Sequence, residues 1–373
     1  MSRDLLVLSL AMATWGVGEG MFYSFQPLYL QQLGADPLTI GGILGIIGVA
    51  MTIAHLPAGY LSDRIGRRPV LISAWLLGTF SAWIMALAGS LSVFVVGAAL
   101  YGATTFVAGP LNSYATAARG KLSIGRAITM LSAFYNLGSV IGPLLGGWVG
   151  ARAGLHANFS IAACIFILSA FLVFFIRPQP TEPHDPERPA GRLKGVFHTR
   201  FLSYLALLFF VFFSLGLPQP LSQNFLQNER HVNLVHIGQL ISLRSAGIVV
   251  FNLLIGQLNA RLGFILAQFC VAAFTVLIWQ GSGIPLYMLA YFFLGSYGTA
   301  RSLAAAIGRH LVETANMGIA YSAIEAVTAL SVILAPPLAG YLYAINPVWV
   351  YPLSLSLILV ALLSSSLFAP RPN

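Results

Sequence analysis

The sequence predicts an all-α integral membrane protein, with twelve transmembrane helices arranged as two parallel six-helix repeats. Three observations lead to this prediction. The 373 residues are 58% hydrophobic and only 8% charged, whereas soluble domains carry about 25% charged residues. The apolar residues form successive runs close to the roughly 20 residues that a helix needs to cross a bilayer. Short motifs in the first half of the chain recur in the second half.

Twelve apolar runs define the expected helices, and most connections between them are very short. The first run contains a single charge, Glu19, and is too long for a signal peptide, so we expect it to be the first span. The two cysteines fall inside apolar runs and indicate neither a disulfide framework nor a metal site. The spans are expected at residues 5–33, 39–61, 69–88, 91–117, 123–149, 156–177, 201–226, 236–258, 264–281, 284–308, 316–343 and 347–368.

Five prolines interrupt the segment that follows the sixth span, and a helix does not continue through them. Residues 178–200 are therefore expected to form a cytoplasmic Pro-rich linker. It would join an N-terminal six-helix bundle, residues 1–177, to a C-terminal six-helix bundle, residues 201–373. A basic patch that binds lipid head groups is the alternative interpretation of this segment.

The distribution of Lys and Arg predicts the orientation of the chain. If both termini are cytoplasmic, fifteen of the 19 basic residues lie on the inner side, and only Arg152 and Arg230 lie on the outer side. This bias follows the positive-inside rule. The formal net charge of +9 therefore marks one membrane face and does not indicate nucleic acid. We expect a multi-pass protein of the cell inner (plasma) membrane.

Two motifs recur at nearly the same spacing. A shift of 193 residues carries the stretch 142–147 onto 335–340. Six helices return the chain to the same side, so the repeats are parallel and related by an axis along the membrane normal. Two such halves are expected to face each other across a central cavity. In the other motif, a shift of 197 residues carries Gly59, Leu61, Arg64 and Gly66 onto Gly256, Leu258, Arg261 and Gly263.

The connection after the second span reads GYLSDRIGRR, residues 59–68, and it resembles the signature between helices 2 and 3 of the major facilitator superfamily. The resemblance implies the major facilitator fold and a conformational latch that favours the outward-open state. In this latch an acid would face the positive end of the eleventh helix, and the arginines would anchor the inner surface. The alternative is a positive-inside loop with no latch. The matching residues are Gly59, Asp63, Arg64, Gly66, Arg67 and Arg68.

The fifth span carries glycines four residues apart around a proline, namely Gly138, Gly142, Pro143, Gly146 and Gly147. The pattern is similar to the helix 5 motif of the superfamily's antiporters, above all the drug–proton exporters. Such glycines flatten one helix face for close packing, so the resemblance implies a helix that packs against the other half and seals the cavity. A generic seam of small residues is the alternative. Those exporters carry a basic residue in helix 4, where this chain has Ala98.

Four charged residues lie inside the expected spans: Glu19, Arg244, Arg301 and Glu325. At 1.5 Å per residue, Glu19 and Arg244 reach one depth, and Arg301 and Glu325 reach another. In the superfamily the corresponding helices line or flank the cavity, so the resemblance implies that all four charges face it. A static ion pair is the alternative interpretation of Arg301 and Glu325.

The surroundings of Glu19 complete the expected cavity. The three glycines beside it are expected to reduce bulk along the transport path. Aromatic neighbours such as Trp15 and Tyr23 would suit an amphipathic substrate, although aromatic residues that only pack helices look the same in a sequence. Further polar candidates are Gln26, Asn112, Tyr135, Asn136, Gln223 and Asn252.

These features predict a secondary active transporter that exports a lipophilic or amphipathic small molecule by proton-coupled alternating access. Glu19 is the first candidate for protonation. One alternative is a facilitator or symporter of a polar or anionic metabolite, bound by Arg244 and Arg301, and another is a non-transporting membrane receptor. No nucleotide, metal or nucleophile–base pattern is found, so we expect no enzyme activity and no cofactor. Expected partners are the substrate, protons and membrane lipids, and the chain is expected to be monomeric.

Overall fold

The computed structural model describes residues 2–179, 197–312 and 317–370, with the side chains of residues 55–64 and 317–319 excepted. Over these ranges the chain is helical and contains no β-strand. Among the described residues, eleven helical segments are long and apolar enough to cross a membrane. The predicted all-α membrane architecture is confirmed, with one correction at the expected tenth span.

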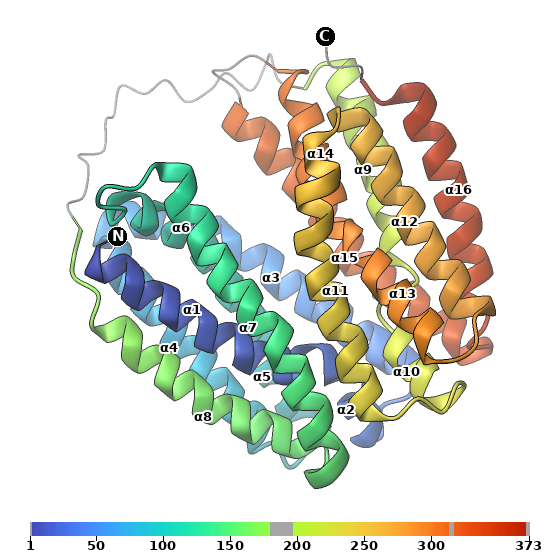
Figure 1. Ribbon diagram of the computed structural model, residues 1–373, viewed down its shortest axis with the longest axis horizontal. Helices are drawn as coiled ribbons and strands as arrows, with labels where there is room; N and C mark the ends of the chain where they lie inside the picture. The colour runs from blue at the N-terminus through green and yellow to red at the C-terminus, as the bar shows by residue number, and fades with distance from the viewer. Residues whose placement is uncertain (1, 180–196, 313–316, 371–373) are drawn as a thin grey trace. The chain divides into compact units, whose positions relative to one another are not determined.

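The first half of the chain supplies the first six expected spans (Figure 1). The first combines α1 (Arg3–Phe22), η1 (Tyr23–Phe25) and α2 (Gln26–Gln32). The fourth combines α5 (Leu91–Ala103), η2 (Thr104–Val107) and α6 (Ala108–Ala117). The other four are the single helices α3 (Pro37–Ile65), α4 (Arg67–Ala86), α7 (Ile124–Ala153) and α8 (Leu155–Phe174).

The second half of the chain differs from the expectation at residues 284–308, which form two consecutive helices. The break falls at Gly295, where the backbone of Gly247 approaches so closely that no side chain fits. Neither piece is long enough to count as a span on its own. The helices of this half are α9 (Thr199–Gly216), α10 (Ser222–Asn228), α11 (Leu234–Leu254) with η4 (Ile255–Gln257), α12 (Ala260–Gln280), α13 (Ile284–Leu294), α14 (Ser296–Arg309), α15 (Met317–Ile345) and α16 (Val350–Phe368).

Several helices begin where the sequence offers a capping hydroxyl. Ser2, Ser90 and Ser123 precede α1, α5 and α7, and each side chain accepts a hydrogen bond from a backbone N–H of the first turn. Such a bond satisfies a donor that has no partner inside the helix. The tight connections α3–α4 and α7–α8 each turn at a glycine with positive φ, 89° at Gly66 and 83° at Gly154, a conformation that glycine adopts without steric cost.

The chain divides into two compact units. Unit 1 comprises Met1–Ala35, Ile46–His184 and Asn233–Ser242, and unit 2 comprises Asp36–Gly45, Asp185–Val232 and Leu243–Asn373. Each unit thus contains most of one half of the sequence together with the start of one helix from the other half, α11 in unit 1 and α3 in unit 2. The division of the sequence into bundles at residues 178–200 stays a prediction.

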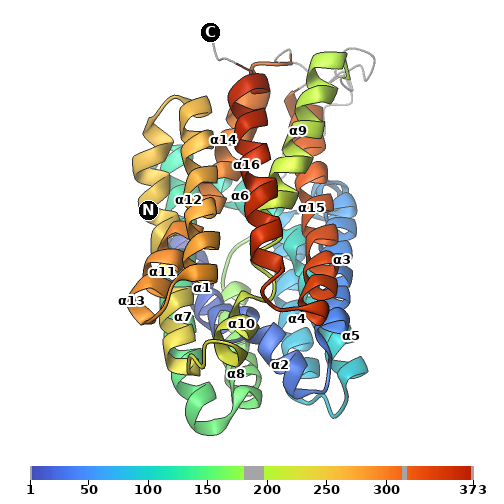
Figure 2. The ribbon, with the colours of Figure 1, turned by 90° about the vertical axis from the view of Figure 1, so that its right-hand side faces the viewer.

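Close helix pairs define the inside of each unit. In unit 1, α1 packs against α7 and α8, and α4 packs against α5 and α8 (Figure 1). In unit 2, α9 packs against α15 and α16, and α12 packs against α13, α14 and α16 (Figure 2). Large aromatic side chains such as Phe166 and Phe264 are fully buried within these groups of helices.

The same helix crossing occurs once in each unit. In unit 1 a Cβ atom on Gly238 of α11 would collide with the carbonyl oxygen of Pro143 in α7. In unit 2 a Cβ atom on Gly41 of α3 would collide with the carbonyl oxygen of Pro336 in α15. The shifts of 197 and 193 residues found in the sequence carry Gly41 onto Gly238 and Pro143 onto Pro336. The two crossings are therefore equivalent contacts of the two repeats.

Equivalent contacts continue for one helical turn on either side of each crossing, with one difference between the two units. Gly147 meets the carbonyl of Leu234 in unit 1, just as Gly340 meets the carbonyl of Pro37 in unit 2. On the other side, the Ser242 hydroxyl donates a hydrogen bond of 2.8 Å to the carbonyl oxygen of Val140. The equivalent position in unit 2 is Gly45, which has no hydroxyl to donate.

Candidate functional site

Glu19 lies near the end of α1, and hydroxyl groups lie close to its carboxylate. The Tyr135 hydroxyl, from α7, donates a hydrogen bond of 3.0 Å to Glu19 Oε2. Tyr101, from α5, and Trp15, one turn earlier on α1, lie near the same carboxylate. The Glu19 side chain is partly exposed. The strongest partners of this acid inside unit 1 are therefore neutral donors.

Tyr101 is the residue near Glu19 that the sequence analysis missed. Tyr101 is 3% exposed, and its hydroxyl has no hydrogen-bond partner among the described residues. Its ring stacks on Trp15 and Phe166, with centroid distances of 5.9 Å and 5.8 Å. In the sequence it looks like any aromatic residue of an apolar helix, so nothing there singled it out.

The three glycines beside Glu19 pack against neighbouring helices, so the expectation that they reduce bulk along a transport path is wrong. A Cβ on Gly16 would collide with the Tyr135 carbonyl oxygen, and one on Gly20 would lie 2.7 Å from Pro143 Cδ. A Cβ on Gly18 would lie 2.7 Å from the Phe166 ring. The bare backbone therefore lets α1 approach α7 and α8, which brings Glu19 to Tyr135.

The glycines of the helix 5 motif lie mainly at the contact between α7 and α1. Gly138, Gly142 and Gly146 would collide, if given a Cβ, with the carbonyl oxygens of three residues of α1. Of its glycines, Gly147 faces α11, and the carbonyl of Pro143 meets Gly238 of the same helix. Packing against the second half of the chain, which the resemblance implied for the whole motif, therefore applies to one of its glycines, and the α1–α7 seam accounts for the others.

Arg244 lies in a polar group of unit 2. Its Nη2 donates to Gln219 Oε1 at 3.3 Å, and Gln219 Nε2 donates to the Leu215 carbonyl at 2.7 Å. The hydroxyls of Ser222 and Tyr291 are 3.0 Å apart and share a hydrogen bond. Glu19 belongs to unit 1 and Arg244 to unit 2, and the shared depth of the two residues stays a prediction.

Arg301 and Glu325 form an ion pair that joins α14 to α15. Arg301 Nη2 lies 2.7 Å from Glu325 Oε2. The side chains are 41% and 63% exposed, so both charged groups are widely accessible. When one charge of a deeply buried pair is removed, the other is left without a partner in a poorly solvated site. Arg301 and Glu325 are too exposed for this effect.

A double-mutant cycle on Arg301→Ala and Glu325→Ala is therefore expected to give a small coupling free energy, at most about 1 kcal/mol, as for other exposed ion pairs. Thermal unfolding of the two single variants and the double variant measures it. A coupling of several kcal/mol would contradict the exposed geometry and would indicate a desolvated pair.

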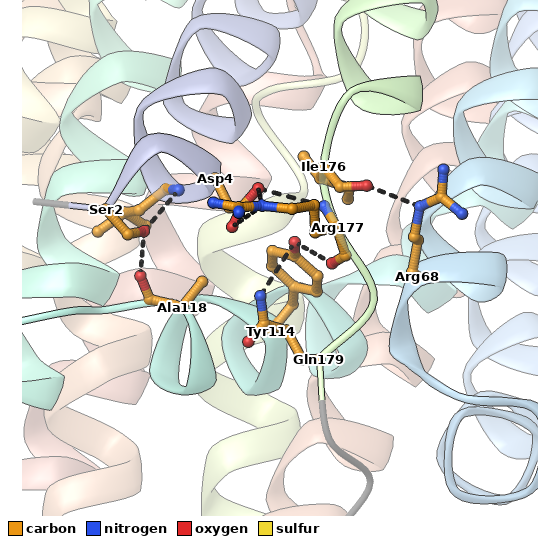
Figure 3. A network of polar contacts seen from close by, with 9 residues as sticks. Ser2, Asp4, Arg68, Tyr114, Ala118, Ile176, Arg177 and Gln179 are labelled. Carbon is orange, nitrogen blue, oxygen red and sulfur yellow. Dashed lines mark hydrogen bonds and ion pairs between the residues drawn. The ribbon is translucent and has the colours of Figure 1, made fainter.

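The predicted latch is described only in part. The side chains of Gly59, Asp63 and Arg64 lie outside the described residues. Arg68 binds the end of α8, since its Nε donates to the Ile176 carbonyl at 2.7 Å (Figure 3). Its Nη2 donates to the Phe174 carbonyl at 3.1 Å. A cation at a helix C-terminus is favoured by the helix dipole. A role of Arg67 and Arg68 as anchors of the inner surface stays a prediction.

The residues around Arg68 form a wider polar network at the end of α8 (Figure 3). Asp4 is buried and accepts hydrogen bonds from the backbone N and the Nε of Arg177, at 3.2 Å and 3.3 Å. The Tyr114 hydroxyl donates to the Arg177 carbonyl at 2.7 Å and accepts a bond from Gln179. The network fastens the start of the segment after α8 to α1, α4 and α6. Before the structure, this network was marked only by Asp4, an acid in the first turn of α1.

Two tyrosine-to-phenylalanine variants test how firmly this network holds. Tyr114→Phe removes a hydroxyl with two partners and is expected to lower the free energy of unfolding by about 1 kcal/mol. Tyr101→Phe removes a buried hydroxyl that has no partner, so it is expected to leave the stability unchanged or raise it. Thermal unfolding in detergent compares the two. Equal losses would contradict the difference in hydrogen bonding.

Among the described residues, no group of three or more His, Cys, Asp or Glu side chains is placed to hold a metal ion. The candidate site is therefore built from Glu19 and its hydroxyl partners in unit 1. In unit 2 the candidate residues are Arg244 and the ion pair of Arg301 and Glu325.

Comparisons with known proteins agree with the helical architecture. The model of a family described as the Major Facilitator Superfamily matches residues 8–264. The inner membrane transport protein YajR of Escherichia coli is 28% identical over 195 residues, which cover 50% of this chain and 42% of that protein. The class D tetracycline resistance protein of Salmonella ordonez is 31% identical over 206 residues, which cover 53% of this chain and 51% of that protein. The matches thus span about half the length of these two relatives.

A solved structure extends the likeness over the whole chain. The crystal structure of the nucleoside transporter NupG superposes with a TM-score of 0.82, covering 99% of this chain and 100% of that chain. The two sequences are 14% identical, so this likeness shows a shared fold alone.

Proposed function

Because this chain belongs to the Major Facilitator Superfamily, we propose that it is a secondary active transporter that exports a lipophilic or amphipathic small molecule in exchange for protons. Alternating access would present one binding cavity to each side of the membrane in turn. The similarity to a tetracycline resistance protein supports the export of a drug-like compound. The protein would lie in the cell inner membrane with both termini cytoplasmic, and it would act as a monomer.

The observation that carries this proposal is the Glu19 carboxylate with its hydroxyl partner. An ionisable residue inside a membrane span is costly and is typically functional. Glu19 is held by the neutral Tyr135 hydroxyl at 3.0 Å, so its charge can change without breaking an ion pair inside unit 1. Its partial exposure gives water, and therefore protons, a route to it.

The aromatic surroundings support an amphipathic substrate. Trp15 and Tyr135 are partly exposed, and Tyr23 is 38% exposed. Aromatic rings with one polar edge bind apolar bodies and still offer a hydrogen bond. The alternative function, transport of an anion bound by Arg301, is less favoured, because Glu325 already neutralises the charge of Arg301.

Reconstitution into liposomes with a pH-sensitive dye inside tests the proposal. A panel of lipophilic and amphipathic compounds is added outside, and a coupled exporter should move protons across the membrane in the opposite direction to the compound. Liposomes without protein are the control. Movement of compounds without protons would favour a facilitator, and movement of neither in any condition would contradict a transport function for the compounds of the panel.

A further inference from the structure

Resting on the proposed function, we infer that Ser242 is a positioning residue that makes the crossing of α7 with α11 the firmer of the two equivalent crossings. Alternating access requires the two repeats to move relative to each other. The first part of α11, up to Ser242, belongs to unit 1, whereas the rest of this helix belongs to unit 2. When the units move, α11 therefore has to part from α7 or bend.

Three contacts follow one another along the crossing of α7 with α11. Leu234, Gly238 and Ser242 lie four residues apart on α11, so they form a row about 12 Å long. At the first two residues the main chains of the helices approach so closely that no further side chain fits. At the third, the Ser242 hydroxyl donates to the Val140 carbonyl oxygen at 2.8 Å. The row thus ends in a directed hydrogen bond between the two helices.

The partner of the Ser242 hydroxyl differs from that of several other buried serines. Ser9, Ser214 and Ser354 each donate to the carbonyl four residues earlier in the same helix. Such a bond satisfies a buried hydroxyl without joining two helices. Ser242 is 6% exposed and donates to a neighbouring helix. This hydrogen bond has to break when α11 leaves α7, so it stabilises the packed form of the pair.

The equivalent crossing in unit 2 lacks this bond. The repeat shifts carry Gly45 onto Ser242 and Val140 onto Ile333. A Cβ built on Gly45 would lie 2.9 Å from the Ile333 carbonyl oxygen, so a main-chain contact takes the place of the hydroxyl bond. A contact between a Cα–H group and a carbonyl is weaker than an ordinary hydrogen bond. The crossing of α3 with α15 is therefore the weaker of the two.

Distances between two spin labels, measured by pulsed EPR in the full-length protein, test the role of Ser242 without a known substrate. The labels are attached to cysteines introduced at Gly89 and Ser282, which are exposed and lie in connections expected on the outer side. The native residues Cys164 and Cys270 are replaced by serine. Ser242→Ala should raise the ratio of the long-distance to the short-distance population about fivefold, because it removes one hydrogen bond of ordinary strength.

Ser354→Ala is the matched control, because it removes a buried hydroxyl that is bonded within α16, and it should leave the ratio in place. Ser242→Gly should shift the ratio in the same direction as Ser242→Ala, since both variants lack the hydroxyl. A merely structural role of Ser242 would lower the unfolding temperature without changing the ratio.

An unchanged ratio, a single distance in every variant, or the same shift in the control would overturn the inference. The liposome assay is independent of this result. A shifted ratio without proton movement would leave the role of Ser242 standing and overturn the proposed exchange of protons for substrate. Coupled transport with an unchanged ratio would do the reverse.

Discussion

Glu19→Gln is expected to abolish proton-driven accumulation of substrate, together with the pH dependence of substrate binding. Glutamine resembles the protonated acid and carries no titrating group, yet its side-chain oxygen still accepts the Tyr135 hydrogen bond. The variant should therefore fold and still bind a neutral substrate. Uptake and binding in proteoliposomes across a pH series, beside the wild type, measure the effect, and accumulation should drop to the level of liposomes without protein.

Glu325→Gln is the matched control, because it removes the other acid predicted to face the cavity from a pair that is largely exposed. Near wild-type accumulation by Glu19→Gln would show that Glu19 does not couple proton movement, and Glu325 would become the candidate. Loss of binding at every pH would instead show that Glu19 contacts the substrate, and a cationic substrate would then be favoured over a neutral one.

Gly142→Ala is expected to destabilise the protein, because the added methyl group overlaps the main chain of α1. The new Cβ would collide with the Val17 carbonyl oxygen and lie 2.8 Å from Gly20 Cα. These are backbone atoms, so no change of rotamer relieves the contact and α1 has to move. Overpacking of this kind costs about 1–3 kcal/mol. Thermal unfolding in detergent should show a lower midpoint.

Gly125→Ala offers a control in the same helix. No atom lies within 4 Å of a Cβ built on Gly125, and alanine favours a helix over glycine by up to about 1 kcal/mol. This variant should unfold at the same temperature as the wild type or a higher one. A similar loss of stability in both variants would show that the α1–α7 seam is not as tight as its geometry implies.

The spans were predictable because the signal for them is local. A run of apolar residues is readable without knowledge of its neighbours, and the order of helices follows from it. The break at Gly295 was not predictable, because it depends on Gly247, a residue of another helix. Residues 284–294 are apolar and residues 296–302, SYGTARS, are mostly polar, but this change in hydropathy does not by itself predict an interruption of the helix.

The charged residues of the site could be predicted from the sequence, but the groups that bind them could not. Glu19 stands out because a carboxylate in an apolar run is rare. Tyr135 was among the polar candidates, but its hydrogen bond with Glu19 was not predicted, because the two residues lie about 115 residues apart in the sequence. Tyr101, about 80 residues from Glu19, was missed because aromatic residues are common in such helices. The glycines were recognised as packing residues in α7 but not in α1, because a small residue does not show which helix lies against it. Arg68 was found through its motif, yet the carbonyls that it binds lie 106 and 108 residues further along.

The twin crossings of α7 with α11 and of α3 with α15 have a consequence for how this chain can change over time. A lost contact between two side chains can be restored by a second substitution in the partner. At Gly41 and Gly238 the partner is a main-chain carbonyl oxygen, which every amino acid presents alike, so no second substitution compensates for a bulkier residue. The restriction to glycine therefore applies in both repeats, whatever side chains the partner helices carry. At the neighbouring pair, Ser242 and Gly45, the two repeats carry different residues, and one of them adds a hydroxyl.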